Sequence, residues 1–204
     1  MSKPSFHRRP ATILCAAALA CFALAACDSK RQQPADTAAA ASIAPPPSDT
    51  AAVPKPSDAQ IAHIAVTANS IDSAAGVLAK SKAQSKAVKD FAQTMITDHT
   101  QVNKQAVALA TKLGVTPEDN DVSRQLQTGA TQSQTDLQGK SGAEFDKAYI
   151  ANEVAYHQAV LDALDKTLIP DAQNAELKAL LEKVRPAIAA HLERAKGIQS
   201  SLGA

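Results

Sequence analysis

Three histidines, His99, His157 and His191, stand at positions where the helical repeat of apolar residues calls for an apolar side chain. Asp72 lies near the middle of a fourth helical segment. At about 1.5 Å of rise per residue, one carboxylate and three imidazoles from four helices can meet at one level of a bundle. Such a set suits zinc, iron or manganese. One interpretation is therefore a metal site made by Asp72, His99, His157 and His191.

Two further acidic residues lie close to this set. Glu153 precedes His157 by one turn on the same helical face, and Asp98 precedes His99 while facing the neighbouring groove. Either could be a ligand or could accept a hydrogen bond from an imidazole N–H, which fixes the tautomer of a ligating histidine. The alternative interpretation is a structural network without metal, in which carboxylates satisfy the buried imidazoles and fix the helix register. The sequence leaves both open.

Motifs of other catalytic classes are missing from the sequence. It contains no Gly-x-Ser-x-Gly motif and no glycine-rich phosphate loop. We therefore assign no catalytic residue, and we expect a binding or structural role more than an enzyme.

Four long helices must position these residues. Apolar residues recur at steps of three and four through each of them, and the chain between the second and third is polar, which indicates a short helix on the outside. Four amphipathic helices with narrow apolar seams predict an all-α four-helix bundle within a domain at 58–204. The first long helix is expected to start near Ser57 and Asp58. The other three are expected to cover about 82–113, 143–169 and 173–199, with the outer helix at 119–138.

The amino end has the layout of a secretory signal, with three basic residues followed by an uncharged run at 11–26. The run ends in Leu-Ala-Ala-Cys, which resembles the lipobox cut by lipoprotein signal peptidase. We therefore predict a signal peptide at 1–26 and lipidation of Cys27, with the membrane as a partner through this anchor. Because Asp28 directly follows Cys27, the inner membrane stays open as the location of the protein, as does the outer membrane.

Residues 27–57 are rich in Ala, Pro, Ser and Thr. Such a segment buries too little apolar area to offset its ordering entropy, so it is expected to be a disordered tether. Removal of Lys3, Arg8 and Arg9 from the 21 basic residues leaves 18 against 20 acidic ones, a net charge of about −2. This charge argues against nucleic-acid binding. It leaves open an envelope protein partner or a homo-oligomer.

Four segments in order resemble domain-of-unknown-function family 4142, over about 58–198. They are Ala-Asn-Ser-Ile-Asp-Ser-Ala-Ala-Gly at 68–76, Phe-Ala-Gln-Thr-Met-Ile-Thr-Asp-His-Thr at 91–100, Phe-Asp-Lys-Ala-Tyr-Ile at 145–150 and Arg-Pro-Ala-Ile-Ala-Ala-His-Leu at 185–192.

The resemblance implies a ferritin-like helical bundle in an exported, outer-membrane protein, and it implies no reaction. The family pattern usually has Glu where this chain has Asp72, which is one methylene shorter. The Glu-x-x-His pairs of di-iron enzymes are absent, because Ile96, Val154 and Ile188 stand three residues before the three histidines. We therefore expect a periplasm-facing lipoprotein that binds zinc, iron or manganese for storage, sensing or stress protection, or else a non-catalytic envelope module.

Overall fold

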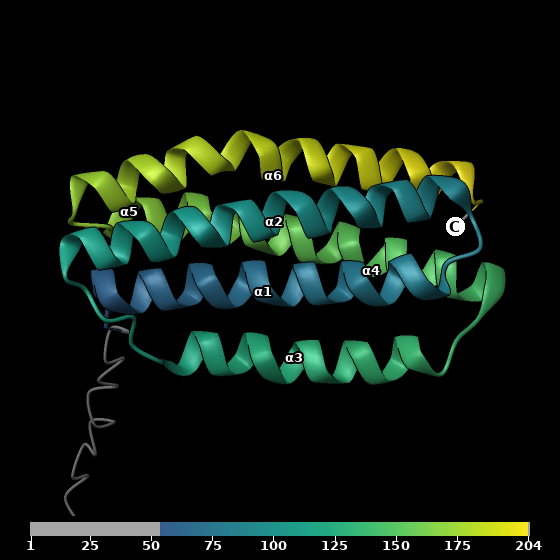
Figure 1. The fold of residues 1–204 in the computed structure, drawn as a ribbon, viewed down its shortest axis with the longest axis horizontal. Coiled ribbons are helices and arrows are strands. Elements are labelled where there is room, and N and C mark those ends of the chain that lie inside the picture. Colours follow the sequence, from purple (N-terminus) through teal and green to yellow (C-terminus); the bar gives the residue numbers. More distant parts are fainter. Residues whose placement is uncertain (1–53, 204) are drawn as a thin grey trace, which may run out of the picture. The chain divides into compact units, whose positions relative to one another are not determined.

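The computed structural model describes residues 54–203, and these residues form an all-α fold without strands (Figure 1), as the sequence predicts. The predicted signal peptide, Cys27 and most of the predicted tether lie outside the described residues. The elements are α1 (Asp58–Lys82), α2 (Lys86–Leu113), α3 (Asp121–Gln138), α4 (Gly142–Ala163), the π-helical turn η1 (Leu164–Leu168), α5 (Ile169–Asp171) and α6 (Ala175–Ser201).

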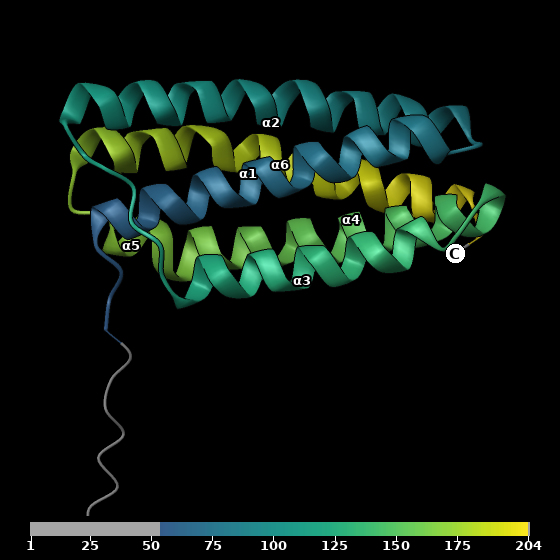
Figure 2. The same cartoon turned by 60° about the horizontal axis from the view of Figure 1, so that its bottom comes forward.

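The four long helices α1, α2, α4 and α6 pack side by side as a bundle (Figures 1 and 2). The most extensive contacts join α1 to α2 and α4 to α6. These pairs are antiparallel because short connections join their members, whereas α3 belongs to a long crossover from α2 to α4. Helix α3 lies outside the bundle against α1 and α4. Each long helix therefore has one face directed into a shared core.

Local capping explains where several helices begin and end. Ser57 and Gln60 form a reciprocal capping box at the start of α1, and Asn120 starts α3 in the same way with Ser123. Gly114 ends α2 with a left-handed φ of 62°, which glycine adopts without the penalty of a Cβ atom. These ends follow from the local sequence.

Contacts between distant segments set two other helix boundaries. The carboxylate of Asp146 accepts hydrogen bonds from the backbone N–H groups of Gln84 and Ser85, at 3.0 and 2.7 Å. At the other end of the bundle, Asp58 accepts from the N–H groups of residues 173 and 174, both at 2.9 Å. Asp146 holds the α1–α2 connection extended, so α2 begins at Lys86 and the boundary expected near residue 82 was wrong.

The third long helix also departs from its expected form. A continuous helix was expected to reach residue 169 and to stop before Pro170, but α4 changes to a π-helical turn at Leu164. The N–H of Ile169 donates to the carbonyl of Leu164, five residues earlier, and helical backbone continues to Asp171. Pro170 has no N–H to donate, and the wider turn lets the chain pass through it.

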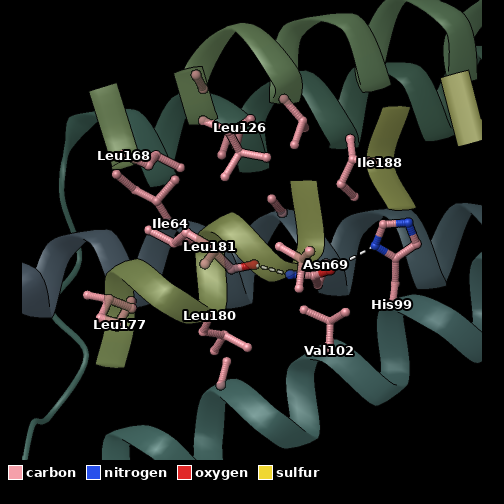
Figure 3. A pocket seen from close by; sticks show the side chains of 18 of the residues that line it. Ile64, Asn69, His99, Val102, Leu126, Leu168, Leu177, Leu180, Leu181 and Ile188 are labelled. Atoms are coloured by element: carbon pink, nitrogen blue, oxygen red, sulfur yellow. Dashed lines mark hydrogen bonds between the residues drawn. The ribbon is translucent and has the colours of Figure 1, made fainter. Parts of the chain in front are cut away.

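The core has two ends of different composition. One end, around Phe91, Phe145 and Tyr149, contains the large buried aromatic side chains, with the rings of Phe145 and Tyr149 stacked 6.2 Å apart. The other end is aliphatic and includes Leu177 and Leu181 (Figure 3). The polar residues of the candidate site lie between these two ends.

Helices α1 and α2 approach each other closely at Gly76. A Cβ atom at this position would lie 3.0 Å from the carbonyl oxygen of Ala92 and 3.0 Å from Cγ1 of Ile96. The backbone oxygen cannot move without shifting α2. The absence of a side chain at Gly76 is therefore a packing requirement.

We expect Gly76→Ala to lower the free energy of unfolding by about 1 to 3 kcal/mol, because the strain of overpacking exceeds the gain in helix propensity. Gly129→Ala is the matched control, since a Cβ atom at this exposed position in α3 meets nothing within 4 Å. The control should stabilise the protein by about 0.5 to 1 kcal/mol. Urea unfolding measures both, and an equal gain for the two variants would contradict the close approach.

Candidate metal centre

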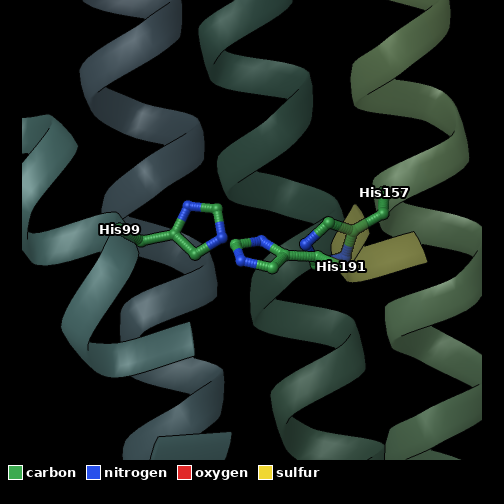
Figure 4. Close-up of side chains that lie close together, drawn as sticks. All are labelled: His99, His157 and His191. Carbon is green, nitrogen blue, oxygen red and sulfur yellow. The ribbon is translucent and has the colours of Figure 1, made fainter. Parts of the chain in front are cut away.

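The bundle brings the three histidines of the candidate set together, and Asp72 lies against two of them. Asp72 comes from α1, His99 from α2, His157 from α4 and His191 from α6, and each is between 1 and 6% exposed. The centroids of the three imidazole rings lie 5.4 to 5.7 Å apart (Figure 4). One ring nitrogen of each histidine lies within 4.8 Å of the others. Three imidazoles therefore converge on one small volume.

An asparagine that the sequence analysis did not single out fixes the orientation of the His99 ring. The side-chain amide of Asn69 donates to the carbonyl of Ala65 at 2.7 Å, which directs its oxygen Oδ1 to Nδ1 of His99, also at 2.7 Å (Figure 3). Because an amide oxygen only accepts, Nδ1 of His99 carries the hydrogen. The available signal was its spacing, three residues before Asp72 on the same helical face.

The other two histidines are held in the same way. Nδ1 of His157 donates to the carbonyl oxygen of Glu153 at 2.9 Å, and Nε2 of His191 donates to Oδ2 of Asp98 at 2.9 Å. Both partners can only accept, so these nitrogens carry the hydrogens. In the neutral rings the opposite nitrogens carry lone pairs. These three buried atoms, Nε2 of His99, Nε2 of His157 and Nδ1 of His191, have no hydrogen-bond partner.

The carboxylate of Asp72 faces two of these nitrogens. Its Oδ2 lies 2.9 Å from Nε2 of His99 and 3.3 Å from Nε2 of His157, yet neither contact has hydrogen-bond geometry and both carboxylate oxygens are unpartnered. Burial acts to raise the pKa of Asp72, but the neighbouring His99 and His157 outweigh it and hold the pKa below its usual value. Asp72 is therefore ionised and directed at nitrogen atoms.

Burial lowers the pKa of His157 and of His191, and in His191 it outweighs the opposing effect of Asp98. Both rings are therefore neutral at pH 7, and their free nitrogens carry lone pairs that a cation can use. A carboxylate oxygen and a lone-pair nitrogen at such distances repel each other unless a proton or a metal cation lies between them.

Glu153 adds a second carboxyl group to the site. Its Oε2 lies 3.5 Å from Nδ1 of His157, and Asp72, Glu153 and His157 form a second group whose ligand atoms lie within 4.8 Å of one another. Burial raises the pKa of Glu153 well above its usual value, and the charge of Asp72 adds to this effect. Glu153 therefore keeps its proton while Asp72 carries the negative charge.

An apolar cavity of about 180 Å³ adjoins this site on the aliphatic side (Figure 3). Asn69, Asp72, His99 and His157 line its inner end, and the rest of its wall is almost entirely aliphatic. The site therefore has a tightly packed aromatic core on one side and open space on the other.

Tyr149 and Tyr156 stand beside the site. The hydroxyl of Tyr156 donates to the carbonyl of Ala68 at 2.9 Å, whereas the buried hydroxyl of Tyr149 has no partner. Burial raises the pKa of both phenols, with further contributions from Asp72 and Glu153. Both tyrosines therefore remain protonated.

We expect Glu153→Gln to stabilise the metal-free protein in a pH-dependent way. The raised pKa of Glu153 contributes stability that is fully present below its unfolded value of about 4.5 and is lost as the pH rises through the folded value. The glutamine has no proton to lose, so its advantage should grow by up to about 1.4 kcal/mol per pH unit between the unfolded and the folded pKa values. Urea unfolding at pH 4.5 and 7.5 measures the effect, and a pH-independent difference would contradict it.

Comparison with known proteins gives a family and no activity. The family described as domain of unknown function DUF4142 matches residues 43–198. No curated protein and no solved structure matches the chain. The match confirms the predicted resemblance, whereas the ferritin-like label and export stay predictions. Because the match spans most of the chain and takes in every residue of the candidate centre, this protein belongs to the DUF4142 family.

Proposed function

We propose that the bundle binds one divalent transition-metal ion through Asp72, His99, His157 and His191. The observation that carries the proposal is the pairing of the imidazole nitrogens. In each ring one nitrogen donates to an acceptor-only group, and the other is buried without a hydrogen-bond partner. Histidines that ligate metals in proteins have this arrangement, since the outer hydrogen bond fixes the tautomer and orients the ring.

A purely structural network accounts for these contacts less well. Such a network would use its carboxylates to satisfy the imidazoles, but of the carboxylates in the described residues of the site only that of Asp98 accepts a hydrogen bond from a ring nitrogen. Asp72 faces His99 and His157 without making a hydrogen bond to either. Each buried polar atom left without a partner costs about 1 to 3 kcal/mol. A cation among the three imidazole nitrogens, with Asp72 beside two of them, would reduce that cost.

The donor set restricts the metal. Three imidazole nitrogens and one carboxylate oxygen suit zinc, iron or manganese. The proposed role is storage or sensing of such a metal, or protection against metal-driven oxidative stress. No hydroxyl or thiol nucleophile stands among the described residues of the centre, so no catalytic step is assigned.

The test is metal analysis of protein purified without a histidine tag after growth with zinc, iron or manganese. Wild-type protein should hold about one ion per chain, as expected for a four-ligand site. His99→Ala should lose the metal, and Asn69→Ala should bind it about 10 to 100 times more weakly, because an outer hydrogen bond is removed.

The control is His63→Ala, since the side chain of His63 is 32% exposed and lies outside the centre. It should keep the metal. Metal contents well below one ion per wild-type chain with all three metals would contradict the proposal, as would equal retention by His99→Ala and His63→Ala. A structural network predicts lower stability for His99→Ala without any change in metal content.

We further propose that the protein is exported and anchored to a membrane of the cell envelope through lipid on Cys27. The support is the Leu-Ala-Ala-Cys motif at the end of an uncharged run, and the Pro- and Ala-rich segment between it and α1. In this proposal the anchor sets where the bundle lies and takes no part in metal binding.

We expect Cys27→Ser to abolish palmitate labelling and to release the protein from the membrane fraction, because no lipid can be attached to serine. Cys21→Ser is the matched control within the same segment, and it should be labelled and retained like the wild type. Labelling that survives in Cys27→Ser would show that the lipidation site was assigned wrongly.

A further inference from the structure

The cavity beside the candidate centre has the size and wall of a binding site for a small apolar molecule. Its volume is about 180 Å³. An apolar cavity of about 150 Å³ in another helical protein stays dry and binds benzene. The present cavity is slightly larger and its wall is comparably aliphatic, so it can hold a compact ring of similar size.

Side-chain sizes in the sequence explain why this space stays open. The fully buried aromatic side chains, Phe91, Phe145 and Tyr149, fill the other end of the core. At the cavity end the bundle has aliphatic residues and many alanines, whose methyl groups are too short to meet across it. The alanines that line the cavity are Ala62, Ala65, Ala68, Ala106, Ala110, Ala159 and Ala163.

Polar atoms available to a ligand are confined to one end of the cavity. At the outer end, Asp58 is committed to the N–H groups of residues 173 and 174, and the side-chain oxygen of Asn174 caps α6. At the inner end the cavity meets Asp72, His99 and His157, each of which has at least one buried polar atom without a hydrogen-bond partner. A bound molecule therefore meets aliphatic carbon over most of its surface and polar ligand atoms at one point.

We infer that this cavity is a ligand chamber for a small, largely apolar molecule of about the size of benzene, with any polar atom directed toward the histidines. Apolar binding depends on the cavity alone. The statement that the ligand's polar atom contacts a metal rests on the proposed function. Apolar binding and metal contact can therefore be tested separately.

The first test uses metal-free protein and benzene. Benzene should raise the melting temperature of the wild type by about 3 to 6 °C at a tenfold excess over its dissociation constant. It should also shift the methyl resonances of Leu181 and Ile188, which line the cavity.

Variants on α2 locate the binding. Ala106→Leu places a larger side chain in the cavity and should abolish both effects, and Ala110→Leu repeats the substitution one turn along. Ala108→Leu is the matched control, because Ala108 is exposed on the opposite side of the same helix and lines no part of this cavity. The inference of a ligand chamber would be contradicted if benzene had no effect on the wild type. It would also be contradicted if the effect were undiminished in Ala106→Leu or Ala110→Leu.

The second test uses the full chain loaded with Co²⁺, whose visible spectrum reports its ligands. Phenol, an aromatic ring with one hydroxyl, should change the spectrum of the wild type and of Ala108→Leu but not that of Ala106→Leu. An equal change in all three would overturn access through the cavity. Failure to bind Co²⁺ together with normal benzene binding would defeat the proposed function and leave the chamber intact.

Discussion

A carboxylate that is 1% exposed inside a helical bundle needs positive charge or hydrogen bonds within reach, and Asp72 has the imidazoles of His99 and His157 and the protonated carboxyl group of Glu153. None of these groups makes a hydrogen bond of good geometry to its oxygens. Taking such an ion out of water costs several kcal/mol. The four long helices each contribute one residue to this level of the bundle, so their register depends on how this charge is compensated.

The proton distribution within the centre follows from the same charge. Two buried carboxyl groups this close cannot both ionise at low cost, and Glu153 is the one that keeps its proton. His157 and His191 are neutral because burial disfavours the imidazolium form. The result is one anion beside imidazole nitrogens, an arrangement that a cation can complete.

The centre also lies at a boundary between two kinds of packing. Stacked aromatic rings close the core on one side, whereas alanines leave a cavity of about 180 Å³ on the other. Empty space inside a bundle lowers stability, and larger side chains in place of the alanines would fill it. We therefore take the open space beside the candidate metal centre as the ligand chamber inferred above.

The sequence by itself determined the helices, the all-α class and the four residues at mid-helix, because a repeat of 3.6 residues is local and places His99, His157 and His191 on the apolar seams. Tertiary structure alone decided which imidazole nitrogens face inward, since ring orientation depends on the acceptors Asn69 and Asp98. It also decided the start of α2 through Asp146 and the existence of the cavity. These features depend on side-chain rotamers and on how far apart the helices pack, which periodicity along one helix does not encode.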